Sequence, residues 1–459
     1  MSRFFERVDP AARLVLLLVL VAFVLRFATL DMKSIWLDEA FSLVMAANFT
    51  SEEMWSVFRD TRHPAGYYWM LRQAIQATGT ELWQLRLPSA LFSLASFGLL
   101  FLLARRLFPG RQKLLLIALS LYALSPLDFW YAQEARMYAA VTMLGLLIAL
   151  GLALNHPAGS LLVYAGLAAG LVTNYTLIPL WVGLSAVWLV YWWQQGRKPL
   201  PLLFNIVAMG AAWWAFHPYY YHLDQLLRHL NTVTLFDRVQ TTLGVPEASG
   251  GIYIVLLAGG GLILLLIGVA GRWLLRHPRW RAILAPPILL GIIACLLVLA
   301  APRLYTAKRI LVTGWPYVVL MGAWLIDAYG QAGQERVRRR WWQALAAVSA
   351  LSLLITILTP KDDWRGLVAY VNQSLDSNSI LKIDPHYNDQ PYNYYEPVTP
   401  ARDEQLNELA AQHEEIWLIS ERVGSATISQ SEQWLDRNWQ LVGREQFHRI
   451  ELRHYQAPQ

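Results

Sequence analysis

The run RLVLLLVLVAFVLRFATL, residues 13–30, is long and apolar enough to cross a membrane as a helix. No small-residue cleavage pattern follows it, and further apolar runs do, which is typical of an anchor and not of a signal peptide. Of the 459 residues, 56% are hydrophobic and 15% are charged. This composition excludes an ordinary soluble protein and predicts a polytopic α-helical membrane protein.

Windows of about 20 apolar residues predict about eleven transmembrane helices. Only Asn174, Tyr175 and Thr176 separate the fifth window from the sixth, and one continuous helix there would make the count even. The windows lie near residues 13–30, 86–104, 113–127, 137–154, 160–174, 176–193, 201–217, 251–271, 282–301, 310–327 and 343–359.

Basic clusters favour two separate spans at that break. With two spans, the clusters at 105–113, 197–198, 272–281 and 336–340 share one side of the membrane with Arg13. By the positive-inside rule this side is the cytoplasm, so we expect a cytoplasmic N-terminus and an extracytoplasmic C-terminus in the inner (plasma) membrane. The net charge of +6 comes largely from these clusters, which indicates contact with anionic lipid and not with nucleic acid.

The composition becomes mixed and polar after Pro360. We therefore predict a transmembrane domain over residues 1–359 and a small extracytoplasmic α/β domain over residues 360–459. The only cysteine, Cys295, excludes a disulfide framework within the chain. The elements expected in the second domain are an amphipathic helix at 362–371, a helix at 402–413, and strands within 414–421 and 439–455.

Two adjacent carboxylates, Asp38 and Glu39, follow the first apolar run in the stretch SIWLDEAFSL, residues 34–43. An interfacial helix over residues 38–47 would turn their side chains about 100° apart, so they cannot reach the same point. We expect one of them to be catalytic and the other to be structural, and a helix N-cap is the structural alternative for Asp38.

Other polar residues gather at the membrane edges of the same side, where charges are costly unless they pair or face a wet cavity. Arg and Lys at helix ends also extend to the interface without any function, and that alternative stays open. An ionised carboxylate among cations suits group transfer from a lipid phosphate, because the carboxylate takes a proton while the cations stabilise the departing phosphate. No D-x-D pair or P-loop is present to serve a nucleotide donor. The gathered residues are Asp60, Arg62, His63, Arg86, Asp128, Glu134, Arg136, Arg303, Lys308 and Arg309.

Five motifs resemble those of the GT-C glycosyltransferases, and they occur in the order found there. The likeness covers roughly residues 10–330 and is greatest to the bacterial branch that includes protein O-mannosyltransferases and lipid A aminoarabinose transferases. The motifs are IWLDEAFS (35–42), DTRHPAGYYWML (60–71), LRLPSALFSLASFGLLFLLARRLF (85–108), YAQEARMYA (131–139) and KRILVTGWPYVVLM (308–321).

The resemblance implies an inverting glycosyltransferase that moves a sugar from a polyprenyl-monophosphate donor to a hydroxyl of a lipid, glycan or protein. Asp38 is then the general base, with Glu39 beside it in the candidate catalytic set. Two departures from the usual motifs occur, His63-Pro64-Ala65 and Arg309-Ile310, and the second leaves open which of Lys308 and Arg309 holds the phosphate. The implied donor-phosphate contacts are Arg86, Arg136, Lys308 and Arg309, and the implied substrate pocket contains Asp60, His63, Glu134 and Tyr138.

Cofactor and class remain partly open at this level. No cofactor is certain, and a divalent metal is possible if Asp38, Glu39 and Glu134 converge. The alternative class is a lipid or glycolipid transporter or flippase, which also needs many spans and intramembrane charge. The charges here gather at one edge and no internal repeat is visible, which favours the enzyme.

Overall fold

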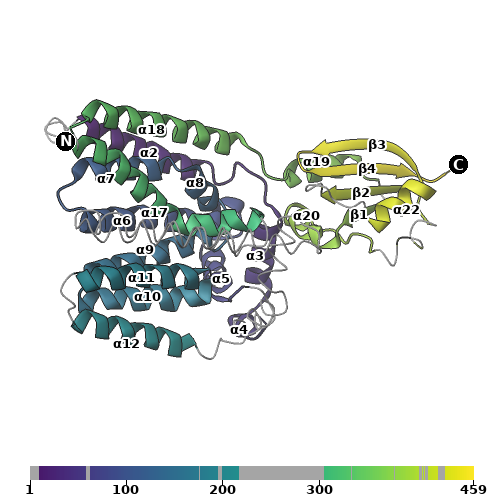
Figure 1. The fold of residues 1–459 in the computed structure, drawn as a ribbon. Helices are drawn as coiled ribbons and strands as arrows, with labels where there is room; N and C mark the ends of the chain where they lie inside the picture. The colour runs from purple at the N-terminus through teal and green to yellow at the C-terminus, as the bar shows by residue number, and fades with distance from the viewer. Residues whose placement is uncertain are drawn as a thin grey trace, which may run out of the picture.

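The computed structural model has a long helical part with a small sheet at one end (Figure 1). The short helices α3 (Leu37–Asn48) and α5 (Gly66–Thr78) lie at the end of the helical part that faces this sheet. The structure describes residues 10–57, 63–174, 176–194, 199–216, 304–331, 333–376, 378–402, 406, 408, 412–421 and 429–458.

Most predicted spans coincide with helices. Predicted spans 251–271 and 282–301 lie outside the described residues, so the count of about eleven stays a prediction. The helices at the predicted spans are α2 (Pro10–Ala28), α6 (Leu82–Leu107), α7 (Gln112–Ala123), α8 (Pro126–Ala132), α9 (Tyr138–Leu154), α10 (Pro157–Thr173), α11 (Leu177–Gln194), α12 (Pro199–Phe216), α17 (Leu304–Gln331) and α18 (Glu335–Leu358). Between α2 and α6 lie the shorter helices α3 (Leu37–Asn48), α4 (Ser51–Val57) and α5 (Gly66–Thr78).

Length and composition alone qualify two helices of the described chain, α6 and α18, to cross a membrane. The pair α7 and α8 would count as a third if it is one span with a 51° bend. The bend has a local cause, since Ser125 accepts a hydrogen bond from the Asp128 N–H and Pro126 opens the second helix. Shorter apolar helices are Val15–Ala28, Tyr138–Leu154, Pro157–Thr173 and Pro199–Ala212.

The fifth and sixth windows are two helices. After α10, the side-chain oxygen of Asn174 accepts a hydrogen bond from the Thr176 N–H at 2.8 Å, which is an Asx turn, and α11 begins at Leu177. The helices approach closely at this corner, because a Cβ on Gly170 would overlap the Leu177 side chain. The short polar break between the windows is therefore a turn.

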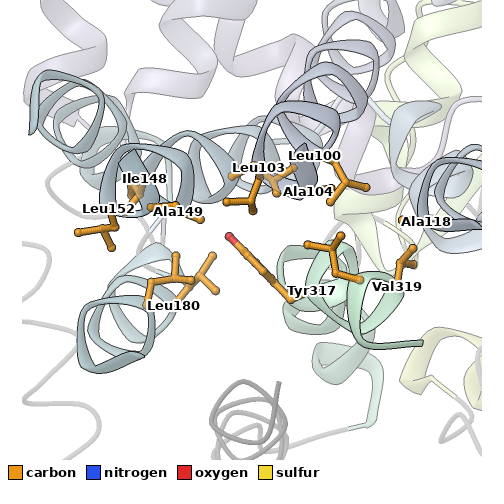
Figure 2. Packing of buried hydrophobic residues seen from close by; sticks show 14 of the residues in the cluster. Leu100, Leu103, Ala104, Ala118, Ile148, Ala149, Leu152, Leu180, Tyr317 and Val319 are labelled. Atoms are coloured by element: carbon orange, nitrogen blue, oxygen red, sulfur yellow. The ribbon is translucent and has the colours of Figure 1, made fainter. Parts of the chain in front are cut away.

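A hydrophobic core joins helices that are far apart in sequence. Figure 2 shows Tyr317 of α17 among side chains of α6, α9 and α11, including Leu103, Ala149 and Leu180. On the outer surface of the bundle, α2 and α18 expose apolar side chains, as expected for helices in contact with lipid. The most exposed of these are Leu20, Val348, Leu351 and Leu358.

The C-terminal region, residues 360–458, contains a four-stranded sheet in the order β1-β2-β4-β3. Strands β1 and β2 are parallel, and β4 runs antiparallel to both β2 and β3. The expected strands and the amphipathic helix after Pro360 are present, whereas the expected helix at 402–413 lies largely outside the described residues. The elements are α19 (Trp364–Ser374), β1 (Ser379–Asp384), η3 (His386–Asn388), α20 (Asp389–Tyr395), β2 (Glu415–Glu421), α22 (Gln430–Asn438), β3 (Gln440–Phe447) and β4 (Ile450–Gln456).

Candidate active site

Helix α3 carries both adjacent carboxylates and treats them differently. The helix begins at Leu37 with Trp36 as the N-cap residue, so Asp38 lies inside the first turn and is not the N-cap that the sequence offered as an alternative. The Asp38 side chain is 26% exposed, whereas that of Glu39 is fully buried. Solvent or a substrate can therefore reach Asp38 and not Glu39.

Glu39 is held by three separate segments. Arg86 of α6 grips it as a fork, with Nε 2.8 Å from Oε1 and Nη2 2.7 Å from Oε2. The Ala135 N–H donates to Oε1 at 2.9 Å, and Lys361 Nζ lies 3.3 Å from Oε2. Burial opposes the charge, but Arg86 and Lys361 outweigh it and lower the pKa of Glu39 to about 2. Both carboxylate oxygens are thus committed within the protein.

Arg86 is equally committed. Besides the fork to Glu39, it donates to the carbonyl oxygens of Leu30 at 2.7 Å, Lys33 at 2.9 Å and Ser34 at 3.0 Å. These contacts use all five of the N–H groups that a guanidinium has. In this arrangement Arg86 ties the chain after α2 to α3 and has no N–H for a donor phosphate, which differs from the role implied by the resemblance.

Asp38 faces Arg136, which the sequence placed among the phosphate contacts. Arg136 Nη2 lies 3.9 Å from Asp38 Oδ2, and its Nη1 donates to Asp38 O at 3.2 Å and to Ser42 Oγ at 3.0 Å. The hydroxyl of Tyr68 on α5 accepts a weaker bond from Nη1 at 3.4 Å. Burial disfavours the charge of Arg136, but Tyr68 and Asp38 raise its pKa, so it stays cationic beside Asp38.

An aromatic cluster packs behind this pair. Tyr138, expected in the substrate pocket, is buried and packs edge-to-face on Tyr131 at 5.1 Å between ring centroids. The cluster also contains Tyr68 and Val312, and Val312 O lies 3.4 Å from the hydroxyl of Thr142. The N-terminal half of α17 therefore reaches the tyrosine side of the site.

Lys308 and Arg309 stand on α17 four and three residues before Val312, so they lie one turn away on the same face. Their side chains lie outside the described residues. The backbone of α17 places both near the tyrosine cluster, and which of them contacts a phosphate remains a prediction. Asp60 also lies outside the described residues, whereas His63 is half-buried just before α5.

Glu134 contacts a residue that the sequence did not single out. Its Oε1 lies 3.6 Å from Nζ of Lys361, which follows the last span. Both residues line a pocket of about 590 Å³ together with Trp36, Trp130, His448 and Arg449. The only sequence signal for Lys361 is its place as the first cation after Pro360.

The comparisons with known proteins agree with this architecture. A family model described as dolichyl-phosphate-mannose-protein mannosyltransferase matches residues 62–216. The apo structure of ArnT from Cupriavidus metallidurans aligns with 97% of this chain and 98% of its own, at 13% identity and a TM-score of 0.55. The chain has the GT-C fold. A second ArnT structure, bound to undecaprenyl phosphate, aligns with 96% of this chain and 97% of its own, at 13% identity and a TM-score of 0.51.

The family model matches only part of this chain. It covers the segment that holds Arg86, Glu134, Arg136 and Tyr138, and it begins after Asp38. No curated protein sequence matches the chain. The GT-C assignment therefore rests on the fold and on one family model, and the roles of individual residues rest on geometry.

Metal ligands do not converge in the described part of this GT-C chain. Within those residues no group of three or more His, Cys, Asp or Glu side chains is arranged to hold an ion. Glu39, one of the three carboxylates that the sequence offered, has both oxygens engaged by Arg86, Lys361 and Ala135. Metal dependence stays a prediction.

Proposed function

We propose that the chain is an inverting glycosyltransferase. It moves a sugar from a polyprenyl-monophosphate donor to a hydroxyl of a lipid, glycan or protein acceptor on the extracytoplasmic face. The GT-C fold supports the class of enzyme, and the matched family model names a dolichyl-phosphate-mannose donor. Undecaprenyl phosphate bound to ArnT supports the polyprenyl carrier.

The observation that carries the proposal is the contrast between the two carboxylates of α3. Glu39 is enclosed, whereas Asp38 is partly exposed beside the buried cation Arg136. A partly exposed carboxylate can take the proton of a hydroxyl that reaches it. Asp38 is therefore the carboxylate of this pair that can serve an incoming hydroxyl.

The reaction we propose is a single displacement. Asp38 takes the proton of the acceptor hydroxyl while the hydroxyl oxygen bonds to the anomeric carbon. The bond from that carbon to the phosphate oxygen breaks, and the lipid phosphate leaves with the bonding electrons. Attack opposite to the leaving group inverts the anomeric centre. Lys308 and Arg309 stabilise the departing phosphate, and Arg136 holds Asp38.

The proposal includes an orientation of the chain in the membrane. The N-terminus is cytoplasmic, and residues 360–459 form an extracytoplasmic domain beside the site. The contacts of Lys361 with Glu39 and Glu134 support this arrangement, because they place the start of the C-terminal region at the end of the bundle that carries α3.

Substitution Asp38→Asn tests the assignment. Loss of a general base typically costs about 10²–10⁴-fold in rate, so transfer by D38N is expected to fall into that range with thermal stability unchanged. Transfer is followed with synthetic undecaprenyl-phosphate sugars in native membrane vesicles, which supply the acceptor. Asp31→Asn is the matched control, because Asp31 lies in the preceding loop with a 57% exposed side chain.

Near wild-type transfer by D38N would remove Asp38 from the role of base. Movement of the labelled lipid across the membrane without release of undecaprenyl phosphate would favour the flippase instead of the enzyme.

A further inference from the structure

One residue of the link between α18 and α19, Lys361, has its side chain buried in the helical part. Lys361 is 6% exposed, and its Nζ lies 3.3 Å from Glu39 Oε2, 3.6 Å from Glu134 Oε1 and 3.3 Å from the carbonyl oxygen of Gln133. The same Nζ lies 5.4 Å from the ring centroid of Trp130. The cation is therefore surrounded by residues of the helical part.

These partners belong to two segments that matter for the site. Glu39 is the neighbour of Asp38 on α3, and Gln133 and Glu134 stand three and two residues before Arg136. Lys361 thus bridges the helix that carries the proposed base and the segment that carries the cation facing it. Such a bridge constrains the 3.9 Å separation of Asp38 and Arg136 without touching either side chain.

Burial makes this bridge costly to break. A buried ion pair adds little over an apolar pair, but removing one partner leaves an uncompensated buried charge and is strongly destabilising. Glu39 would keep Arg86 and the Ala135 N–H, whereas Glu134 would lose the ion pair with Lys361. Residues 133–136 are therefore expected to relax first when Lys361 is lost.

We propose that Lys361 is a positioning residue for sugar transfer, which holds α3 and residues 133–136 in register so that Asp38 stays aligned with Arg136. The proposal rests on the proposed function. Under this proposal, the link after the last span contributes a residue that supports the geometry of the active site. A misplacement of about 1 Å in a reacting group can lower the rate by about 10²-fold, so a small relaxation suffices.

Another ion pair of the same link provides a matched control. Arg365 of α19 lies 3.1 Å from Asp31, and the two side chains are 46% and 57% exposed. It joins the same two parts of the molecule, but within the described residues its side-chain hydrogen bonds go to Asp31, which precedes α3. Exposed ion pairs contribute little to stability, so the effect of losing this pair is expected to be mild.

The experiment compares Lys361→Met with Arg365→Ala in the full-length protein. K361M is expected to lower kcat by about 10–100-fold with the KM for a synthetic undecaprenyl-phosphate sugar changed less than about twofold. R365A is expected to stay within about twofold of wild type in both. Hydrogen exchange of the amides in residues 37–48 and 133–137 is expected to be at least about tenfold faster in K361M only.

The outcomes separate this inference from the proposed function. Wild-type kcat in K361M, or unchanged exchange in both segments, would overturn the positioning role. Absence of transfer by the wild-type protein from every donor tested would overturn the function, while the exchange comparison would still decide whether Lys361 holds the segments. If K361M is poorly folded, K361M/E134Q removes the charge imbalance and is held to the same expected results.

Discussion

Asp38 and Glu39 are neighbours in sequence with opposite environments, and the difference arises from helix geometry. A rotation of about 100° per residue turns Glu39 toward Arg86 and leaves Asp38 at the rim. The sequence predicted that the two would diverge and that one would be structural. Helix geometry alone did not say which, because Arg86 lies 47 residues away along the chain, and only the family resemblance named Asp38 as the base.

A second buried ion pair also has its charges satisfied within the protein. Arg26, inside the first apolar run, lies 3.0 Å from Asp128, which also accepts bonds from Ser93 and Tyr122. The sequence placed Asp128 among the polar residues of the site. Its partners are instead those of a structural network that joins α2, α6, α7 and α8, as intramembrane charges require.

Acid should destabilise the protein through Glu39. Because its pKa falls from 4.5 unfolded to about 2 folded, the stabilisation is complete above pH 4.5 and is lost as pH falls toward 2. The shift corresponds to about 3 kcal/mol as an upper estimate. Thermal unfolding of the detergent-solubilised protein is measured between pH 6 and the lowest pH that keeps it soluble.

The control for this titration is Glu39→Gln, which cannot ionise. E39Q is expected to be less stable than wild type at neutral pH, since Arg86 loses its ionic partner, and the gap should narrow as pH falls below 4.5. A gap that stays constant over this range would show that Glu39 is not the group responsible.

At the scale of elements, close approach of backbones decides where helices turn and pack. The corner at Asn174 separates α10 from α11, and Ser125 with Pro126 bends α7 into α8. Helices α9 and α10 approach so closely that a Cβ on Gly159 would overlap the carbonyl oxygen of Gly151. Small residues allow such contacts between membrane helices.

Gly159→Ala is therefore expected to lower stability by at least about 1–3 kcal/mol, because the added methyl must displace backbone. Gly98→Ala is the matched control, since a Cβ on Gly98 of α6 meets nothing within 4 Å. In a helix interior, Ala in place of Gly by itself favours the helix by about 1 kcal/mol, so G98A should be neutral or stabilised. Thermal denaturation in detergent measures both, and equal effects would contradict the packing argument.

At the scale of the molecule, α3 lies at the end of the bundle that faces the C-terminal region, next to α20 (Figure 1). Several contacts join these parts besides Lys361. The Tyr395 hydroxyl accepts from the Ile35 N–H at 3.0 Å, and the Tyr394 hydroxyl donates to Thr80 O at 3.1 Å. Site and C-terminal region must therefore share one side of the membrane.

Cysteine labelling tests which side this is. In a Cys295→Ser background, Glu445→Cys on β3 should react with a membrane-impermeant maleimide in intact cells, because Glu445 is exposed and the C-terminal region is expected to be extracytoplasmic. Arg336→Cys, exposed at the start of α18, should react only after permeabilisation. The reverse pattern would invert the topology, and labelling of both from outside would exclude α18 as a span.

The sequence by itself determined the apolar helices of the described residues, the helix with its two carboxylates and strands β2, β3 and β4, because hydrophobic run length and periodicity are local properties. It did not predict β1. Only the tertiary structure decided that Arg86 clamps Glu39, that Asp128 belongs to a structural network and that Lys361 enters the site. Lys361 and Glu39 are 322 residues apart, and nothing local records which charges will be buried together. Burial fixes the partners of a charge, and burial depends on how the helices pack.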